Sequence, residues 1–131
     1  MDIRAAAAIV FDDRGRLLMV RRGRRPAAGS WSIPGGKCQD EETTEAACVR
    51  ECAEETGLTI KVERLAGRVW VAAGDHDQFV IDDYLCRLVG GRLQAGDDAD
   101  LARWVSRAEF DRLDLIDGLA AALADWDLLP D

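Results

Sequence analysis

One stretch, Gly36–Leu58, constrains the fold of this chain more than any other. Its acidic start at Asp40, Glu41 and Glu42 predicts a helix N-terminus, because negative charge and side-chain acceptors suit the unpaired N–H groups of a first turn. Gly57 predicts the helix end, since glycine readily takes the positive φ that follows a last turn. The stretch therefore predicts a helix of about three to four turns.

Wound at about 100° per residue, this helix separates acidic residues from small apolar ones. Glu51, Glu54 and Glu55 share one face, where like charges one turn apart repel by about a few tenths of a kcal/mol. A divalent cation would reverse that repulsion, and Mg²⁺ binds carboxylate, water and phosphate oxygens. The opposite face, which we expect to pack on a sheet, carries Ala46, Val49 and Ala53.

The same residues resemble the Nudix box, which reads Gly, five residues, Glu, seven residues, Arg-Glu, an apolar residue, one residue, Glu-Glu, one residue, Gly and an apolar residue. The matching positions, with every spacing met, are Gly36, Glu42, Arg50, Glu51, Cys52, Glu54, Glu55, Gly57 and Leu58. Cys52, in an apolar position, is the only mild departure. The alternative, an acidic surface helix after a turn, requires no such fixed offsets. Segments 29–36 and 90–105 extend the likeness over most of the chain.

The resemblance implies an α/β Nudix fold, in which a mixed β-sheet is sandwiched between α-helices, as a single domain over residues 1–131. It also implies hydrolysis of a nucleoside diphosphate linked to another group, with Mg²⁺ or Mn²⁺ as cofactor. The residues agree with this chemistry, because metal ions neutralise a diphosphate, orient it and lower the pKa of bound water.

Carried over position by position, the resemblance makes Glu51, Glu54 and Glu55 metal ligands and catalytic residues, and Gly35 a metal ligand through its carbonyl oxygen. Glu51 or Glu55 would also position or deprotonate the attacking water, although a loop glutamate does so in many members. Arg50 is expected to orient the carboxylates, because its planar fork pairs with them better than lysine does.

Substrate contacts are expected from Gly36, Lys37 and Arg22, of which Lys37 and Arg22 lie where relatives touch phosphate. For Arg22, a solvated strand end is an equal alternative. Glu42 would support the helix start, and a purely structural role is about equally favoured.

A further acidic metal ligand is expected in a loop well after the box. Asp98 is preferred over Asp97 and Asp100, because Gly96-Asp97-Asp98-Ala99 resembles a segment in one branch of the family. The alternative is a solvated acidic loop. Leu101 stands where that branch often carries glutamate, which leaves the loop base unassigned.

The net charge of −8 gives the chain no diffuse attraction to nucleic acid polymers or anionic membranes. No apolar run approaches the roughly 18 residues of a membrane span, and Ala5–Phe11 predicts a strand rather than a signal peptide. We expect a cytoplasmic protein, a monomer or homodimer, whose partner is a small-molecule nucleotide. Free thiols are expected, since no CxxC pair occurs, at Cys38, Cys48, Cys52 and Cys86.

The remaining elements follow from alternation and turn residues. Ala5–Phe11 and Leu17–Arg22 predict a hairpin that turns at Asp12–Gly15. Further extended segments are expected at 31–34, 59–65, 68–72, 79–88, 92–94 and 103–105. Ser106 and Glu109 predict a capping box, and a last helix is expected over 116–126. Large buried anchors are expected at Trp31, Trp70 and Trp104, and one of these or Phe79 would stack on a base.

The substrate is the least determined feature. Arg21-Arg22-Gly23 and the flanking segments look like a branch of ADP-ribose pyrophosphatases, yet Ala73 stands where many of these enzymes have proline. ADP-ribose-type substrates are therefore modestly favoured over nucleoside triphosphates, including oxidised dNTPs cleaved by MutT-like members. Two alternatives are a non-catalytic Nudix-fold module that binds a nucleotide and a small acidic interaction protein without an active site.

Overall fold

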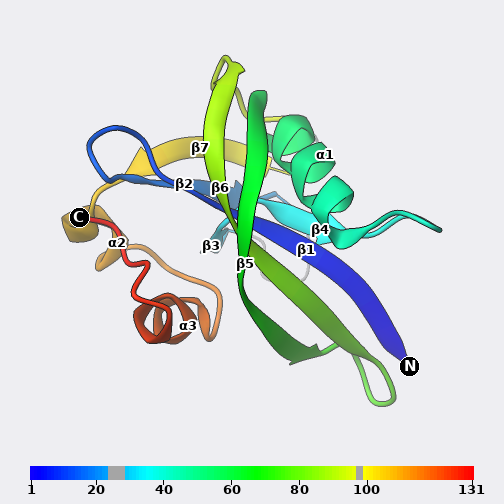
Figure 1. Cartoon of the computed structure of the whole chain (residues 1–131). Coiled ribbons are helices and arrows are strands. Elements are labelled where there is room, and N and C mark those ends of the chain that lie inside the picture. The colour runs from blue at the N-terminus through cyan, green and yellow to red at the C-terminus, as the bar shows by residue number, and fades with distance from the viewer. Residues whose placement is uncertain (24–28, 97–98) are drawn as a thin grey trace.

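The computed structural model describes residues 1–23, 29–96 and 99–131, in which strands dominate and helices are few (Figure 1). Its elements are β1 (Asp2–Val10), β2 (Leu17–Arg22), β3 (Trp31–Ser32), β4 (Gly35–Lys37), α1 (Thr44–Thr56), β5 (Leu58–Ala72), β6 (Gln78–Gly91), β7 (Ala99–Val105), α2 (Arg107–Phe110) and α3 (Leu119–Asp125). The expected α/β class is confirmed.

The strands form two sheets, with the orders β4-β1-β6-β5 and β3-β2-β7. The first sheet is mixed, because β1 runs parallel to β6 and antiparallel to β4. One face of this sheet packs on α1 through a cluster that includes Ala8, Cys52 and Tyr84. The other face packs on α2, α3 and the second sheet through a cluster that includes Ile9 and Leu123. The sheet thus lies between helices, as predicted.

The predicted hairpin of β1 and β2 is wrong, although its turn is correct. Gly15 has a φ of 74°, and the Asp12 carboxylate accepts hydrogen bonds from the backbone of Arg14 and Arg16. The two strands nevertheless belong to different sheets, joined only by a bridge between Phe11 and Leu17 among the described residues. β6 occupies one edge of β1 along its whole length, and β4 occupies the other edge at residues 5–7, so little of β1 is left for β2 to pair with.

Helix α1 starts later than the acidic residues predicted. Thr43 is the N-cap, and its hydroxyl accepts a hydrogen bond from the Ala46 N–H at 3.1 Å. Glu41, with a φ of 65°, is not helical. The predicted end is confirmed, because Gly57 has a φ of 75° and donates to the Ala53 carbonyl.

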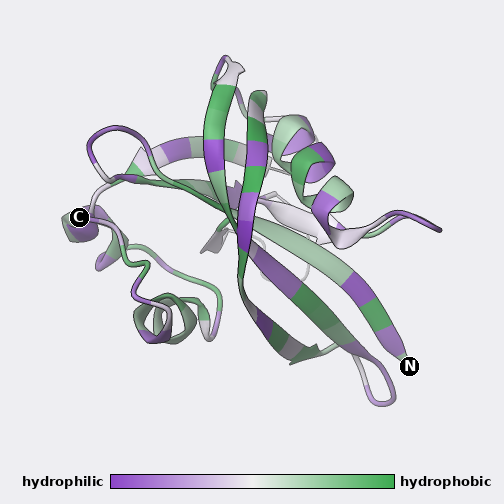
Figure 2. Cartoon of the chain, in the orientation of Figure 1, coloured by the Kyte–Doolittle hydropathy of each residue, from purple (hydrophilic) through white to green (hydrophobic). Residues whose placement is uncertain are grey.

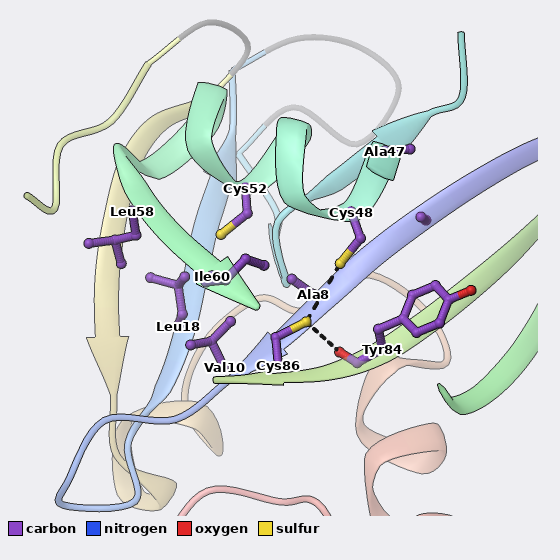
Figure 3. Close-up of a cluster of buried hydrophobic side chains, with 11 residues drawn as sticks. Ala8, Val10, Leu18, Ala47, Cys48, Cys52, Leu58, Ile60, Tyr84 and Cys86 are labelled. Carbon is purple, nitrogen blue, oxygen red and sulfur yellow. Dashed lines mark hydrogen bonds between the residues drawn. The ribbon is translucent and has the colours of Figure 1, made fainter. Parts of the chain in front are cut away.

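The predicted packing face of α1 is also wrong. Ala46 and Ala53 are exposed and Val49 is half-buried, whereas the helix buries Ala47, Cys48, Cys52, Glu55 and Thr56. Figure 3 shows Cys48 and Cys52 projecting from α1 towards Ala8 and Ile60. Cysteine packs as a small hydrophobic residue, so the two cysteines, rather than the alanines, mark the inner face.

All four cysteines are free thiols, as predicted. Cys48 Sγ donates to the Ala7 carbonyl and lies 3.7 Å from Cys86 Sγ, the contact drawn in Figure 3. The hydrogen bond to Cys86, together with burial, raises the pKa of Cys48. Cys48 therefore stays protonated, and both thiols pack in the buried cluster beneath α1.

The segments predicted at 59–65 and 68–72 form one strand, β5, whose pairing with β6 shifts register at three places. Figure 2 shows hydrophilic bands interrupting these long strands. Residues 92–94 do not form the predicted strand. Trp70 is 60% exposed, so its prediction as a buried anchor is wrong.

Near the C-terminus, the capping box of Ser106 and Glu109 is confirmed, and α3 is shorter than predicted. The Trp126 ring that follows α3 lies against Gly67, where a Cβ atom would come within 2.6 Å of the indole nitrogen. None of the helices in the described ranges combines the length and apolar character that a bilayer crossing requires.

Candidate active site

A pocket of about 860 Å³ opens on the face of the first sheet that is opposite to the main body of α1. Part of its floor carries only short side chains or none, because Ala5 and Ala7 on β1 lie next to Gly35 on β4. Strand alternation turns Ala6 and Ala8 to the α1 side, where both are buried. The small residues of the central strands thus create the hollow.

Glu51 and Glu55 of α1 reach the rim of this pocket. Glu55 is buried and accepts a hydrogen bond from the Gly35 N–H at 3.1 Å. A Cβ atom on Gly36 would lie only 2.6 Å from the Glu51 carboxyl carbon. The two glycines before the helix therefore let β4 approach the glutamates closely.

Arg50 joins the loop before α1 to the glutamates of the helix. Its guanidinium donates to both Glu42 carboxylate oxygens at 2.8 Å, and its Nη1 donates to Glu51 at 2.7 Å. A further bond reaches the Lys37 carbonyl at 3.1 Å. Hydrogen bonding to Arg50 lowers the pKa of Glu42 to about 2. Arg50 and Glu42 thus form a charged clamp that fixes the loop against the helix.

Glu54 differs from the other two glutamates of the box. Its side chain is 40% exposed, pairs with Arg50 Nη1 at 3.2 Å and does not line the pocket. Within the ranges that the structure describes, no three His, Cys, Asp or Glu side chains are grouped as a metal-ligand set. Of the three box glutamates, Glu51 and Glu55 supply carboxylate oxygens to the pocket, which is the donor chemistry that Mg²⁺ prefers. The ligand set of three glutamates stays a prediction.

The predicted substrate contacts Arg22, Gly36 and Lys37 all line the same pocket. Lys37 Nζ lies 5.7 Å from the centre of the Phe79 ring, a cation–π distance. Gly35 donates its backbone N–H to Glu55, and the predicted role of its carbonyl as a metal ligand stays a prediction. Asp97 and Asp98 lie outside the described residues, and so does the side chain of Asp100.

Sequence reasoning missed part of the pocket wall. The segment that starts α3, from Ile116 to Ala122, covers one side, and Asp83 on β6 lies on the floor. Asp83 was visible in the sequence as a polar residue within an apolar strand. Alternation places it and Asp82 on opposite faces of the sheet, which is the signal that points one of them inward.

A family model described as the NUDIX domain matches residues 1–126. The chain therefore belongs to the Nudix family, and the class predicted from its sequence, a Nudix hydrolase acting on pyrophosphate bonds, is confirmed.

Two relatives carry different substrate names. The chain is 35% identical over 122 residues to the putative 8-oxo-dGTP diphosphatase 2 of Mycobacterium tuberculosis, covering 92% of the chain and 84% of the relative. It is 36% identical over 96 residues to the ADP-ribose pyrophosphatase of Methanocaldococcus jannaschii, covering 72% of the chain. The match spans only 57% of the latter relative.

Solved structures agree on the fold. A MutT Nudix hydrolase from Burkholderia pseudomallei superposes with a TM-score of 0.83 at 27% identity, covering 95% of this chain and 97% of the other. The MutT protein of Methanosarcina mazei Go1 has a TM-score of 0.85 at 24% identity, covering 96% and 93%. The latter likeness supports the fold alone.

Proposed function

We propose that this protein is a pyrophosphohydrolase dependent on Mg²⁺ or Mn²⁺, which cleaves a nucleoside diphosphate linked to another group. The observation that carries this proposal is the pocket itself. Glu51 and Glu55 line it together with the cationic side chains of Lys37 and Arg22, and its floor is largely apolar. Such a pocket offers carboxylates to a metal, cations to phosphate oxygens and a dry surface to a base.

A bound divalent ion supplies charge neutralisation of the diphosphate and a lowered pKa of bound water. Glu51 and Glu55 would hold that ion at the rim of the pocket. Lys37 and Arg22 would bind phosphate oxygens, and Arg50 would keep Glu51 oriented through its bond at 2.7 Å. Water attacks one phosphorus, the bridging P–O bond breaks, and two phosphate-bearing products leave. One of the pocket carboxylates accepts the proton of the water.

For the substrate, we place ADP-ribose-type molecules modestly ahead of nucleoside triphosphates. The relative named ADP-ribose pyrophosphatase supports the first class, at 36% identity. The relative named putative 8-oxo-dGTP diphosphatase 2 supports the second, over a larger share of the chain. Asp98 remains our candidate for a loop ligand of the metal.

Hydrolysis would be followed on a panel of nucleotides with Mg²⁺ and with EDTA. We expect turnover only with metal; equal turnover in EDTA, or none on any diphosphate with Mg²⁺, contradicts the proposal. The substrate order would come from kcat/KM for ADP-ribose, the four dNTPs and 8-oxo-dGTP at equal free Mg²⁺. A triphosphate preferred by more than about tenfold, or 1.4 kcal/mol in transition-state binding, reverses the order.

A Nudix-fold module that binds nucleotides without cleaving them is the second candidate. It would bind the same panel and show no metal-dependent product. The presence of every charged residue of the box, with Glu51 and Glu55 in the pocket, favours the enzyme.

A further inference from the structure

Two neighbouring aspartates on β6 have opposite surroundings. Asp82 faces α1, where its carboxylate accepts hydrogen bonds from Arg68 at 2.5 Å and from the Thr44 hydroxyl at 3.0 Å. Asp83 faces the other side of the sheet and lines the pocket. Hydrogen bonding to Arg68 lowers the pKa of Asp82, whereas burial and the charge of Asp82 raise the pKa of Asp83 to about 7.

The side chain of Asp83 is mostly buried, and its carboxyl faces the pocket. Its exposed fraction is 5%. No group in the described ranges forms a hydrogen bond or an ion pair with its carboxyl. Its neighbours across the strands are Ala7 and Gly67, which cannot donate through a side chain. Withdrawing a carboxyl from bulk water without a bond to any described residue costs folding free energy, so a carboxyl kept at this place in the pocket indicates a role towards a ligand.

The position of Asp83 suits the part of a nucleotide that lies beyond its phosphates. Gly35, Ala7 and Asp83 are paired across consecutive strands, so Asp83 lies about 10 Å from the glycine beside Glu55. A nucleobase edge lies at a comparable distance from the 5′ phosphate of its own nucleotide. The carboxyl therefore sits where a base would reach if the diphosphate lay at Glu51 and Glu55.

The surfaces around Asp83 favour a flat base over a sugar. Phe79 and Ile81 on β6, and Val69 and Val71 on β5, line the same floor. Apolar walls accept an aromatic ring, whereas they would leave the hydroxyls of a ribose without partners. A single acceptor group within such a floor fixes orientation and selectivity.

We propose that Asp83 is the base-reading residue of this pocket, and that its carboxyl accepts a hydrogen bond from an amino group on the edge of the nucleobase. The inference rests on the proposed function only for the orientation of the nucleotide. It assigns selectivity for amino-bearing bases to a residue outside the Nudix box.

Equilibrium binding of nucleoside monophosphates tests this inference without metal and without turnover. Two pairs differ by one amino group: GMP against IMP, and AMP against purine riboside 5′-monophosphate. Calorimetry on the intact chain would give the affinity ratio within each pair. We expect the wild type to favour the amino-bearing member of at least one pair by about tenfold or more.

The variant Asp83→Leu removes the acceptor at similar volume. We expect the preferred ratio to fall to about threefold or less and the Tm to stay equal or rise, because an unpaired buried carboxyl has been removed. Asp82→Asn is the matched control on the same strand. It should lower the Tm, through loss of the ion pair with Arg68, and keep the wild-type ratio.

Three outcomes overturn the inference: a wild type that does not discriminate within either pair, an Asp83→Leu variant that keeps the ratio, or an equal loss in both variants. Failure of the proposed function has a different signature, which is base-selective binding without hydrolysis of any diphosphate.

Discussion

At the residue scale, the three box glutamates are distinguished by burial. Glu55 is buried against Gly35, Glu51 is half-buried under Arg50, and Glu54 is exposed. A sequence motif treats the three alike, because it records spacing along the chain and not the depth of a pocket. The structure therefore ranks Glu55 first for mutation.

Changing Glu55 to Gln removes one charge and keeps the size of the side chain. We expect kcat to fall by at least about a hundredfold, because an electrostatic group next to the reacting phosphate is lost. The amide oxygen still accepts from Gly35, so the fold should be kept, as checked by Tm. Glu45→Gln, on the exposed first turn of the same helix, is the control and should keep its rate. A near-normal rate for Glu55→Gln at saturating metal would rule out the assigned role.

The raised pKa of Asp83 predicts that the stability of the protein depends on pH. Burial first, and the charge of Asp82 second, raise its pKa in the folded state from 3.8 to about 7. The folded state then binds more protons than the unfolded one between these values, so the free energy of unfolding should decrease from about pH 4 to about pH 7. This loss of unfolding free energy, caused by ionising Asp83 in the folded state, is absent below about pH 4. It is complete above about pH 7, where it is on the order of a few kcal/mol.

Chemical denaturation of the wild type and Asp83→Asn at pH 5 and pH 8 measures this loss. The variant lacks the titrating group, so its advantage over the wild type should be larger at pH 8. The other charged groups that line the pocket are present in both proteins: Arg22, Lys37, Glu51, Glu55 and Asp117. An advantage that is the same at both pH values would contradict the raised pKa of Asp83.

The sequence predicted the charged residues that the Nudix box contributes to the pocket and missed Asp83 on its floor. Gly36, Lys37, Glu51 and Glu55 were predicted and do line one pocket. They lie within a contiguous segment, in which a local pattern carries the geometry. Asp83 was not predicted, because its inward orientation depends on pairing between β6 and strands distant in sequence.

At the element scale, α1 shows what a helical pattern does and does not determine. The helix end predicted at Gly57 was correct, because it depends on the conformational preference of that one residue. Its inner face was assigned to alanines, whereas the chain buries cysteines and Glu55. An acidic residue on the inner face is costly in an ordinary helix. The Gly35 N–H and the pocket make it acceptable here, and neither was visible from α1 alone.

Arg50→Lys tests how the loop before α1 is held. Lysine cannot donate two parallel hydrogen bonds to the Glu42 carboxylate as Arg50 does. It also cannot reach Glu42, Glu51 and the Lys37 carbonyl at the same time. We expect faster amide hydrogen exchange in residues 37–43 and a lower kcat. Arg107→Lys is the control and should change neither, because the ion pair of Arg107 with Asp111, the C-cap residue of α2, is exposed. Unchanged exchange in Arg50→Lys would show that the clamp does not order the loop.

At the scale of the whole molecule, the division of the strands into two sheets could not be predicted from the sequence. Local alternation finds strands, but it does not say which edges pair. The run Ala5–Val10 is buried throughout, so it carries no alternation that would mark a partner. The mixed sheet between helices was nevertheless predicted correctly, because the family resemblance carries long-range information.

Metal linkage is a prediction for the whole fold. If Glu51 and Glu55 bind Mg²⁺ in the folded state only, stability should rise by about 2.7 kcal/mol at a metal concentration of a hundred times Kd. Thermal unfolding with Mg²⁺ and with EDTA measures the shift. The double variant Glu51→Gln, Glu55→Gln should lose most of it, and a wild type without any shift would argue against a metal site.

The alternation of alanines along β1 has an evolutionary consequence. Ala5 and Ala7 border the pocket, whereas Ala8 does not and is packed beneath α1. A methyl group gained at Ala5 would alter which ligands fit, while the same change at Ala8 would strain the packing of the helix. Ligand range can therefore drift in descendants of this chain through position 5 of β1, leaving the pocket carboxylates and the cluster beneath α1 untouched.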